Sequence, residues 1–124
     1  MTTQSPYNKY VSVAVNTSSQ EHLVLMLYDA ALKFSNQAVL ALDENNLMKL
    51  TESVKRAMDI IRELQLSLKL DYEISGDLYA LYHYTKECLV VGNTELNREM
   101  LVEACDLLKE FRDTWREAIR LTKG

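Results

Sequence analysis

The chain has 124 residues, which is the length of one ordinary domain, and 48% of them are hydrophobic while 26% are charged. This composition is globular and excludes an intrinsically disordered chain. The net charge of −4, without a visible basic stripe, argues against a nucleic-acid binder. Three glycines and one proline leave few helix breakers, so we expect an all-α fold.

No segment of the sequence is typical of membrane insertion or secretion. The longest apolar run, from Leu23 to Tyr28, is far shorter than a membrane span. The N-terminal residues lack the basic start and apolar centre of a secretory signal. Cys88 and Cys105 are too few and too far apart for a disulfide framework or a zinc site. We therefore expect a cytoplasmic protein without membrane insertion, in which both thiols are packed.

Residues 1–17 show no helical periodicity. They are polar, with Tyr7, Tyr10 and alternating valines, a pattern that fits an extended segment or a loop laid on the body of the protein. We expect these residues to form a cap segment on a single bundle domain made by residues 18–124. The pattern leaves open whether the cap is helical or extended.

The first predicted helix follows Ser18 and Glu21, which are spaced as a capping box. Its apolar residues recur every three or four positions, and we expect it to end near Asp43–Asn46. A second helix should begin near Leu47 and end before Asp71. The expected core residues of these two helices are Leu23, Leu27, Ala30, Phe34, Ala38, Ala41, Leu47, Leu50, Val54, Ala57, Ile61, Leu64 and Leu68.

A third helix is expected from about Ile74 to Val91, with Gly92-Asn93 as its stop, because glycine tolerates the left-handed conformation that closes a helix. A fourth should begin between Thr94 and Asn97. The short connections predict an antiparallel, up-down four-helix bundle. The expected core residues here are Leu78, Leu81, Tyr82, Thr85, Leu89, Leu101, Ala104, Leu108, Phe111, Trp115 and Ala118.

The first and third helices carry more apolar surface than one core face requires. On a helical wheel of about 100° per residue, the first helix has a second seam, and the third has apolar residues on both flanks. Either the cap covers this surplus around an unusually central third helix, or part of it forms a groove for an amphipathic partner helix. Both hold if the cap is removable. The candidate groove or cap residues are Tyr7, Tyr10, Leu25, Tyr28, Leu32, Val39, Tyr79 and Tyr84.

No motif for catalysis or for a cofactor is visible. Neither His22 nor His83 follows a carboxylate by three residues, as a ferritin-like metal site requires. A glycine-rich phosphate loop and a nucleophile elbow are also missing. Asp29 could be a lone acid, but a bonded structural carboxylate is favoured, and His83 with Glu87 fits a surface pair. We expect a protein that is not an enzyme and uses no cofactor or metal.

Several segments resemble, in order and spacing, the flagellar secretion chaperone FliS family. The resemblance covers almost the whole chain. It departs from the family at Asp29-Ala30, where the family tends to have Asp-Gly, and at Gly92-Asn93, where it tends to have Ala-Asn. The matching segments are Tyr7 and Tyr10 before a valine-rich stretch, Thr17-Ser18-Ser19, LVLMLYDAALKF at 23–34, LYALYHY at 78–84, Gly92-Asn93 and FRDTW at 111–115.

The resemblance implies a cytoplasmic helical bundle of the bacterial flagellum that holds the disordered C-terminal segment of new flagellin. It implies that this chaperone prevents premature polymerisation and aids delivery to the export gate, the entry of a type III secretion system. It also implies that the N-terminal segment covers part of the client site in the free protein. The residues alone leave open a helical adaptor or a structural homo-oligomer, and we expect a monomer or weak homodimer.

Overall fold

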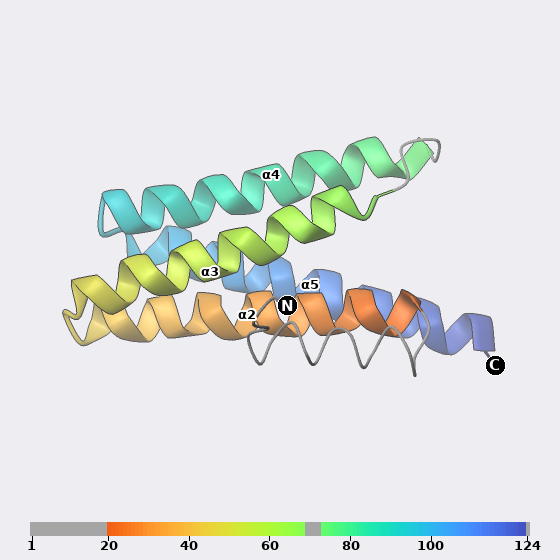
Figure 1. The fold of residues 1–124 in the computed structure, drawn as a ribbon, viewed down its shortest axis with the longest axis horizontal. Helices are drawn as coiled ribbons and strands as arrows, with labels where there is room; N and C mark the ends of the chain where they lie inside the picture. The colour runs from red at the N-terminus through yellow and green to blue at the C-terminus, as the bar shows by residue number, and fades with distance from the viewer. Residues whose placement is uncertain (1–19, 69–72, 124) are drawn as a thin grey trace, which may run out of the picture.

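The computed structural model describes residues 20–68 and 73–123, and these form four helices without a strand. The helices are α2 (Gln20–Asp43), α3 (Leu47–Leu66), α4 (Glu73–Thr94) and α5 (Arg98–Lys123). Consecutive helices run in opposite directions (Figure 1), which confirms the antiparallel up-down bundle. The proposed cap, with Tyr7 and Tyr10, lies outside the described residues, as does Ser18 of the expected capping box.

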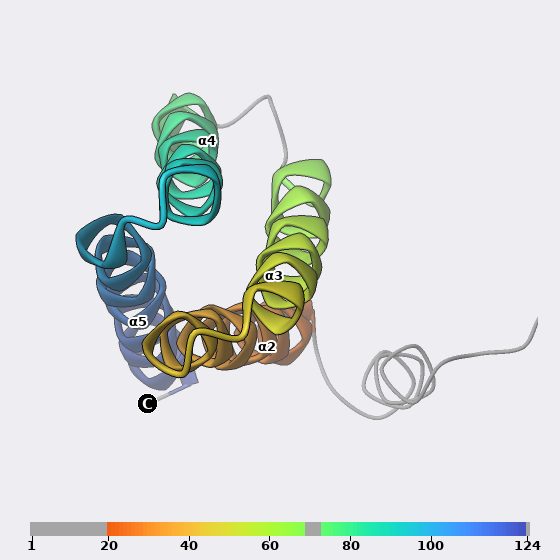
Figure 2. The same cartoon turned by 90° about the vertical axis from the view of Figure 1, so that its left-hand side faces the viewer.

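The four helices follow one another around the bundle. α2 packs between α3 and α5, and α4 packs against α5 and α3. The end view shows α2 and α4 at diagonal positions (Figure 2). Each of these two helices therefore has two neighbours, and each needs apolar residues on more than one side.

The core runs along the bundle axis and contains most of the residues that periodicity predicts. On α2 the buried stripe differs by one position from the expected one, because Ala31 and Ser35 are fully buried while Ala30 and Phe34 are half-buried. From Ala31 onward the buried residues of α2 are small, whereas Leu27 and Tyr28 are buried earlier in the helix. Among the described side chains of α4, the buried ones are Tyr82, Thr85, Cys88 and Leu89.

Three residues expected in the core are exposed instead. Leu47 is the first residue of α3 and is 46% exposed, and Leu81 on α4 is 41% exposed. Ala118 is exposed near the end of α5, where this helix extends past the others (Figure 1). Helical spacing alone places all three near a buried stripe.

The connections α2–α3 and α4–α5 share one backbone design. In each, the middle residue is left-handed, with φ 57° at Asn45 and 51° at Leu96. In each, the next residue, Asn46 or Asn97, caps the following helix by accepting a backbone N–H bond at its side-chain oxygen. Each of these asparagines also donates its own backbone N–H to a carbonyl five residues earlier, which closes the preceding helix.

Gly92 does not stop the third helix, so that expectation is wrong. It lies inside α4 and is buried, and no glycine among the described residues has positive φ. A Cβ at Gly92 would lie 2.4 Å from Cδ2 of Leu101 and 3.2 Å from its backbone nitrogen. The missing side chain is therefore required by the close approach of α4 and α5, and the helix ends two residues after Gly92, at Thr94.

Candidate protein-binding surface

Three side-chain contacts show which face of α2 meets α5. The Trp115 indole N–H donates to the backbone oxygen of Glu21 at 2.8 Å. Arg112 bonds Asp29 at 3.4 Å, which confirms the reading of Asp29 as a bonded carboxylate. A third pair, Arg98 with Asp43 at 2.8 Å, joins the other ends of these helices. Residues 21, 29 and 43 of α2 therefore mark the side that faces α5.

The second apolar seam of α2 lies on this same side. Leu25, Leu32 and Val39 follow positions 21 and 29 at spacings of three and four residues, which places them on one helical face. Leu32 and Val39 are half-buried and pack against the core, and Leu25 is half-buried. We therefore infer that α5 covers most of this seam and that little of it is exposed to a partner.

Tyr28 is a core residue, so its assignment to a groove or cap is wrong. It is 3% exposed, and its hydroxyl hydrogen-bonds the hydroxyl of Tyr82, which is 2% exposed. Phe111 completes the cluster, with its ring centroid 6.1 Å from Tyr28 and 5.4 Å from Tyr82. Burial raises the pKa of both tyrosines, so both remain neutral. The ring of Tyr28 packs inward because α2, α4 and α5 each contribute one aromatic ring to this cluster.

Four of the ten large hydrophobic residues that are exposed in the described structure lie on α4. Tyr79 is 48% exposed, Leu81 41%, Tyr84 42% and Val90 40%. We call these four residues the α4 surface. Tyr79 and Tyr84 are the two predicted site residues that the structure shows exposed to solvent. Exposed tyrosines with apolar neighbours are typical of protein interfaces.

The α4 surface has two flanks. Tyr84 donates a hydrogen bond of 3.5 Å to Glu103 of α5, so Tyr84 and Leu81, three positions earlier, lie on the flank toward α5. Asn93 accepts a bond of 3.1 Å from Thr51 of α3, which marks the other flank. By helical spacing Tyr79 and Val90 lie toward this second flank. A binding partner can therefore contact α4 along either neighbouring helix.

Charged and polar groups lie between and beside the apolar residues of α4. His83 and Glu87 form a surface pair at 3.8 Å, as predicted. The pKa of Tyr84 is raised, mainly by its hydrogen bond with the Cys88 thiol and further by Glu103. Tyr84 therefore stays protonated and offers its hydroxyl as a donor at the rim of the surface.

Sequence reasoning missed Leu81 as a member of the α4 surface. Its spacing from Leu78, Tyr82 and Thr85 placed it in the core. The available signal was the heptapeptide at 78–84 itself, which has too many large apolar residues for one buried stripe.

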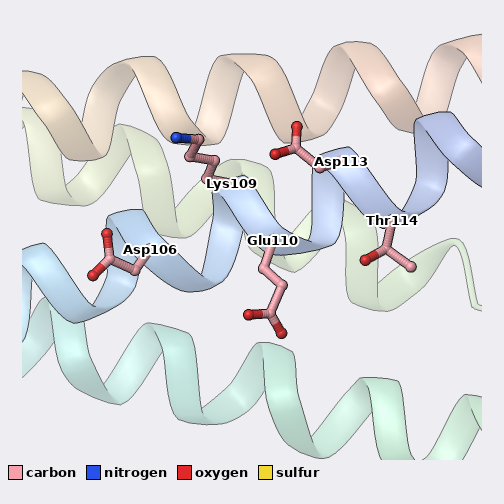
Figure 3. Close-up of a pocket in the computed structure, with 5 residues that line it drawn as sticks. All are labelled: Asp106, Lys109, Glu110, Asp113 and Thr114. Carbon is pink, nitrogen blue, oxygen red and sulfur yellow. The ribbon is translucent and has the colours of Figure 1, made fainter.

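The hollow that the structure describes on α5 is not built as a small-molecule site. It has a volume of about 320 Å³ and is lined by Asp106, Lys109, Glu110, Asp113 and Thr114. These side chains fan out to both sides of one helix and do not converge (Figure 3). Within the described ranges, no His, Cys, Asp and Glu side chains group to hold a metal.

Both thiols are packed, as expected, and neither has the environment of a nucleophile. Cys88 and Cys105 are free and buried. Burial is the main cause that raises the pKa of Cys105 to about 11 and that also raises the pKa of Cys88. A thiol with a raised pKa is protonated and unreactive at neutral pH. None of the described helices is long and apolar enough to cross a membrane.

The described residues define a small helical bundle with exposed apolar side chains on α4. The model of the family Flagellar protein FliS matches residues 3–122, and this chain belongs to that family. The chain is 35% identical to the flagellar secretion chaperone FliS of Bacillus subtilis, covering 97% of this chain and 90% of that protein. It is 32% identical to the one of Escherichia coli, covering 88% and 82%. It is 30% identical to the one of Campylobacter jejuni, covering 90% and 88%.

Proposed function

We propose that this protein is a cytoplasmic export chaperone that binds the disordered C-terminal segment of flagellin and uses the α4 surface to do so. It prevents premature polymerisation and helps to present flagellin to the flagellar export gate. The observation that carries the proposal is the set of exposed apolar residues on α4 in a chain of this family. Similarity to relatives named flagellar secretion chaperones supports the same activity.

The α4 surface suits a disordered client that must later be released. Covering apolar area contributes roughly 25 cal/mol per Å². Ordering a flexible segment costs about 2–5 kcal/mol of that gain. The difference gives useful affinity without permanent binding. Tyr7 and Tyr10 belong to this proposal as part of a cap that covers the client site until flagellin displaces it.

Calorimetric titration of the full chain with a peptide of the flagellin C-terminal segment tests the proposal. We expect a one-to-one complex, with helicity gained by the peptide. Tyr79→Ser combined with Tyr84→Ser should weaken binding by about tenfold or more, because aromatic residues dominate binding energy at interfaces. Leu121→Ser, at an exposed position on α5, is the matched control and should bind normally.

Absence of heat at micromolar concentrations would refute the client assignment, and equal affinity of the double variant would refute the α4 surface. A structural homo-oligomer built through Leu25 and Leu32 is less well supported, because Leu32 packs against the core. Light scattering that shows a concentration-dependent dimer, lost in a Leu25→Ser variant, would favour that alternative. The proposed chaperone needs no catalytic residue and no cofactor.

A further inference from the structure

The connection α4–α5 contains a residue that its backbone does not favour. The twin connections place Asn45 and Leu96 at the same left-handed position. Asparagine adopts this conformation readily, whereas leucine is strained there by its Cβ. Asn45 is the kind of residue expected at this position when the backbone conformation is the only constraint.

Leu96 does not offset that strain by packing. Its side chain is 50% exposed, and it is not part of the buried core. A leucine that is disfavoured by its backbone and unused by the core indicates a contact with something outside the chain.

Other apolar side chains are exposed at the same end of the bundle. Leu47 is 46% exposed and Met48 is 87% exposed at the start of α3. Both connections lie at one end of the bundle (Figure 1), where Thr51 of α3 also donates a hydrogen bond of 3.1 Å to Asn93 of α4. We call Leu47, Met48 and Leu96 the loop-end patch.

Charge around the loop-end patch identifies the chemistry of its partner. Within residues 20–68 and 73–123, Glu44, Glu95 and Glu99 form no ion pair, and Lys49 is the cation at this end that also forms none. An apolar patch with an acidic rim is complementary to an apolar surface with a basic rim. The same rim disfavours a second copy of this chain, because like charges would face each other.

We propose that the loop-end patch docks a second protein through an amphipathic helix whose apolar face is edged by lysine and arginine. The patch lies beyond the end of α4, at one end of the bundle, whereas the α4 surface lies along its side. This partner therefore binds while a client occupies α4. The proposal rests on the loop-end residues alone and does not depend on the identity of the client.

The test is a titration of the isotopically labelled full chain, followed by nuclear magnetic resonance, with a synthetic leucine–lysine peptide that forms one amphipathic helix. It is run with and without the flagellin C-terminal peptide. We expect the amide signals of the loop-end patch to shift in both cases. Leu96→Asn should reduce affinity about tenfold, as expected for a central apolar contact. A peptide with glutamate in place of lysine should not bind.

Leu96→Asn also provides its own folding control. Asparagine suits the left-handed position, so this variant should need more urea to unfold than the original chain. Asn45→Leu, in the twin connection, should be less stable but should bind the peptide normally. Equal peptide affinity of Leu96→Asn, shifts confined to α4, patch shifts caused by the flagellin peptide, or dimerisation through the patch would each overturn the proposal.

Discussion

Helices α2 and α4 have a similar distribution of apolar residues, but they expose different amounts of it to solvent. Both carry apolar residues around most of their circumference. α2 packs between α3 and α5, buries Leu27, Tyr28 and several small residues, and half-buries its second apolar seam. α4 places large residues such as Tyr82 inward and leaves Tyr79 and Tyr84 exposed. A helix that is apolar on most of its sides therefore leaves apolar residues exposed where its two neighbours do not cover them.

The largest expected difference between α2 and α4 comes from two tyrosines. Tyr28→Ala should destabilise the fold by about 3–5 kcal/mol, because it empties a buried aromatic site. Tyr84→Ala should change stability by about 0.5 kcal/mol or less, as is usual at the surface. Urea unfolding followed by circular dichroism measures both. Similar losses for the two variants would contradict the distinction between core and surface.

The buried hydroxyl pair is expected to behave as a unit. Tyr28→Phe alone leaves the Tyr82 hydroxyl without its partner, which should cost about 1–3 kcal/mol. Changing both to phenylalanine removes both hydroxyls and should cost less than the sum of the single changes. A double-mutant cycle of unfolding free energies measures this. Additive losses would show that the two hydroxyls do not depend on each other.

The close approach of α4 to α5 predicts a smaller effect at Gly92. Gly92→Ala should destabilise the fold by about 1–2 kcal/mol, because its Cβ overlaps Leu101. In a Leu101→Ala background the overlap with the side chain is gone and only the 3.2 Å contact with the backbone nitrogen remains, so the same change should cost clearly less. Thermal unfolding of the four proteins measures the difference. If Gly92→Ala costs the same in both backgrounds, the steric account is wrong.

The smallest expected effect is the response to alkaline pH. The pKa of Tyr28 and of Tyr82 is raised in the folded state by burial, while unfolded tyrosine keeps a pKa near 10.0. Above that pH the unfolded tyrosines bind fewer protons than the folded ones, so the stability that this pair contributes is full below about pH 10 and falls above it. Replacing both tyrosines by phenylalanine should make the fall shallower, while the buried thiols contribute equally to both proteins. An unchanged slope would show that these hydroxyls do not couple to folding.

The sequence predicts the four helices, their order and most of the core, because periodicity reports directly which face is buried. It does not predict how closely neighbouring helices approach. Tyr28 and Tyr84 have equivalent patterns on the wheel, yet one is buried and the other exposed. That difference depends on how the helices pack, because Tyr28 meets Tyr82 and Phe111 in the core whereas Tyr84 lies beside Glu103 at the rim.

Turn geometry shows the same limit. Gly92-Asn93 has the composition of a helix stop, but contact with Leu101 gives the glycine another role. The helix is in fact closed by a turn with Leu96 in the left-handed conformation, which leucine adopts less readily than glycine or asparagine. Sequence rules that describe one helix at a time do not include contacts between helices.

The most direct test of the account is to map where flagellin binds. Amide and side-chain signals of the full chain are compared before and after addition of the flagellin C-terminal peptide. The account predicts that the largest shifts fall on Tyr79, Leu81, Tyr84 and Val90, and that Tyr28 of α2 stays in the same buried environment. Large shifts on α2 with none on the α4 surface would contradict it.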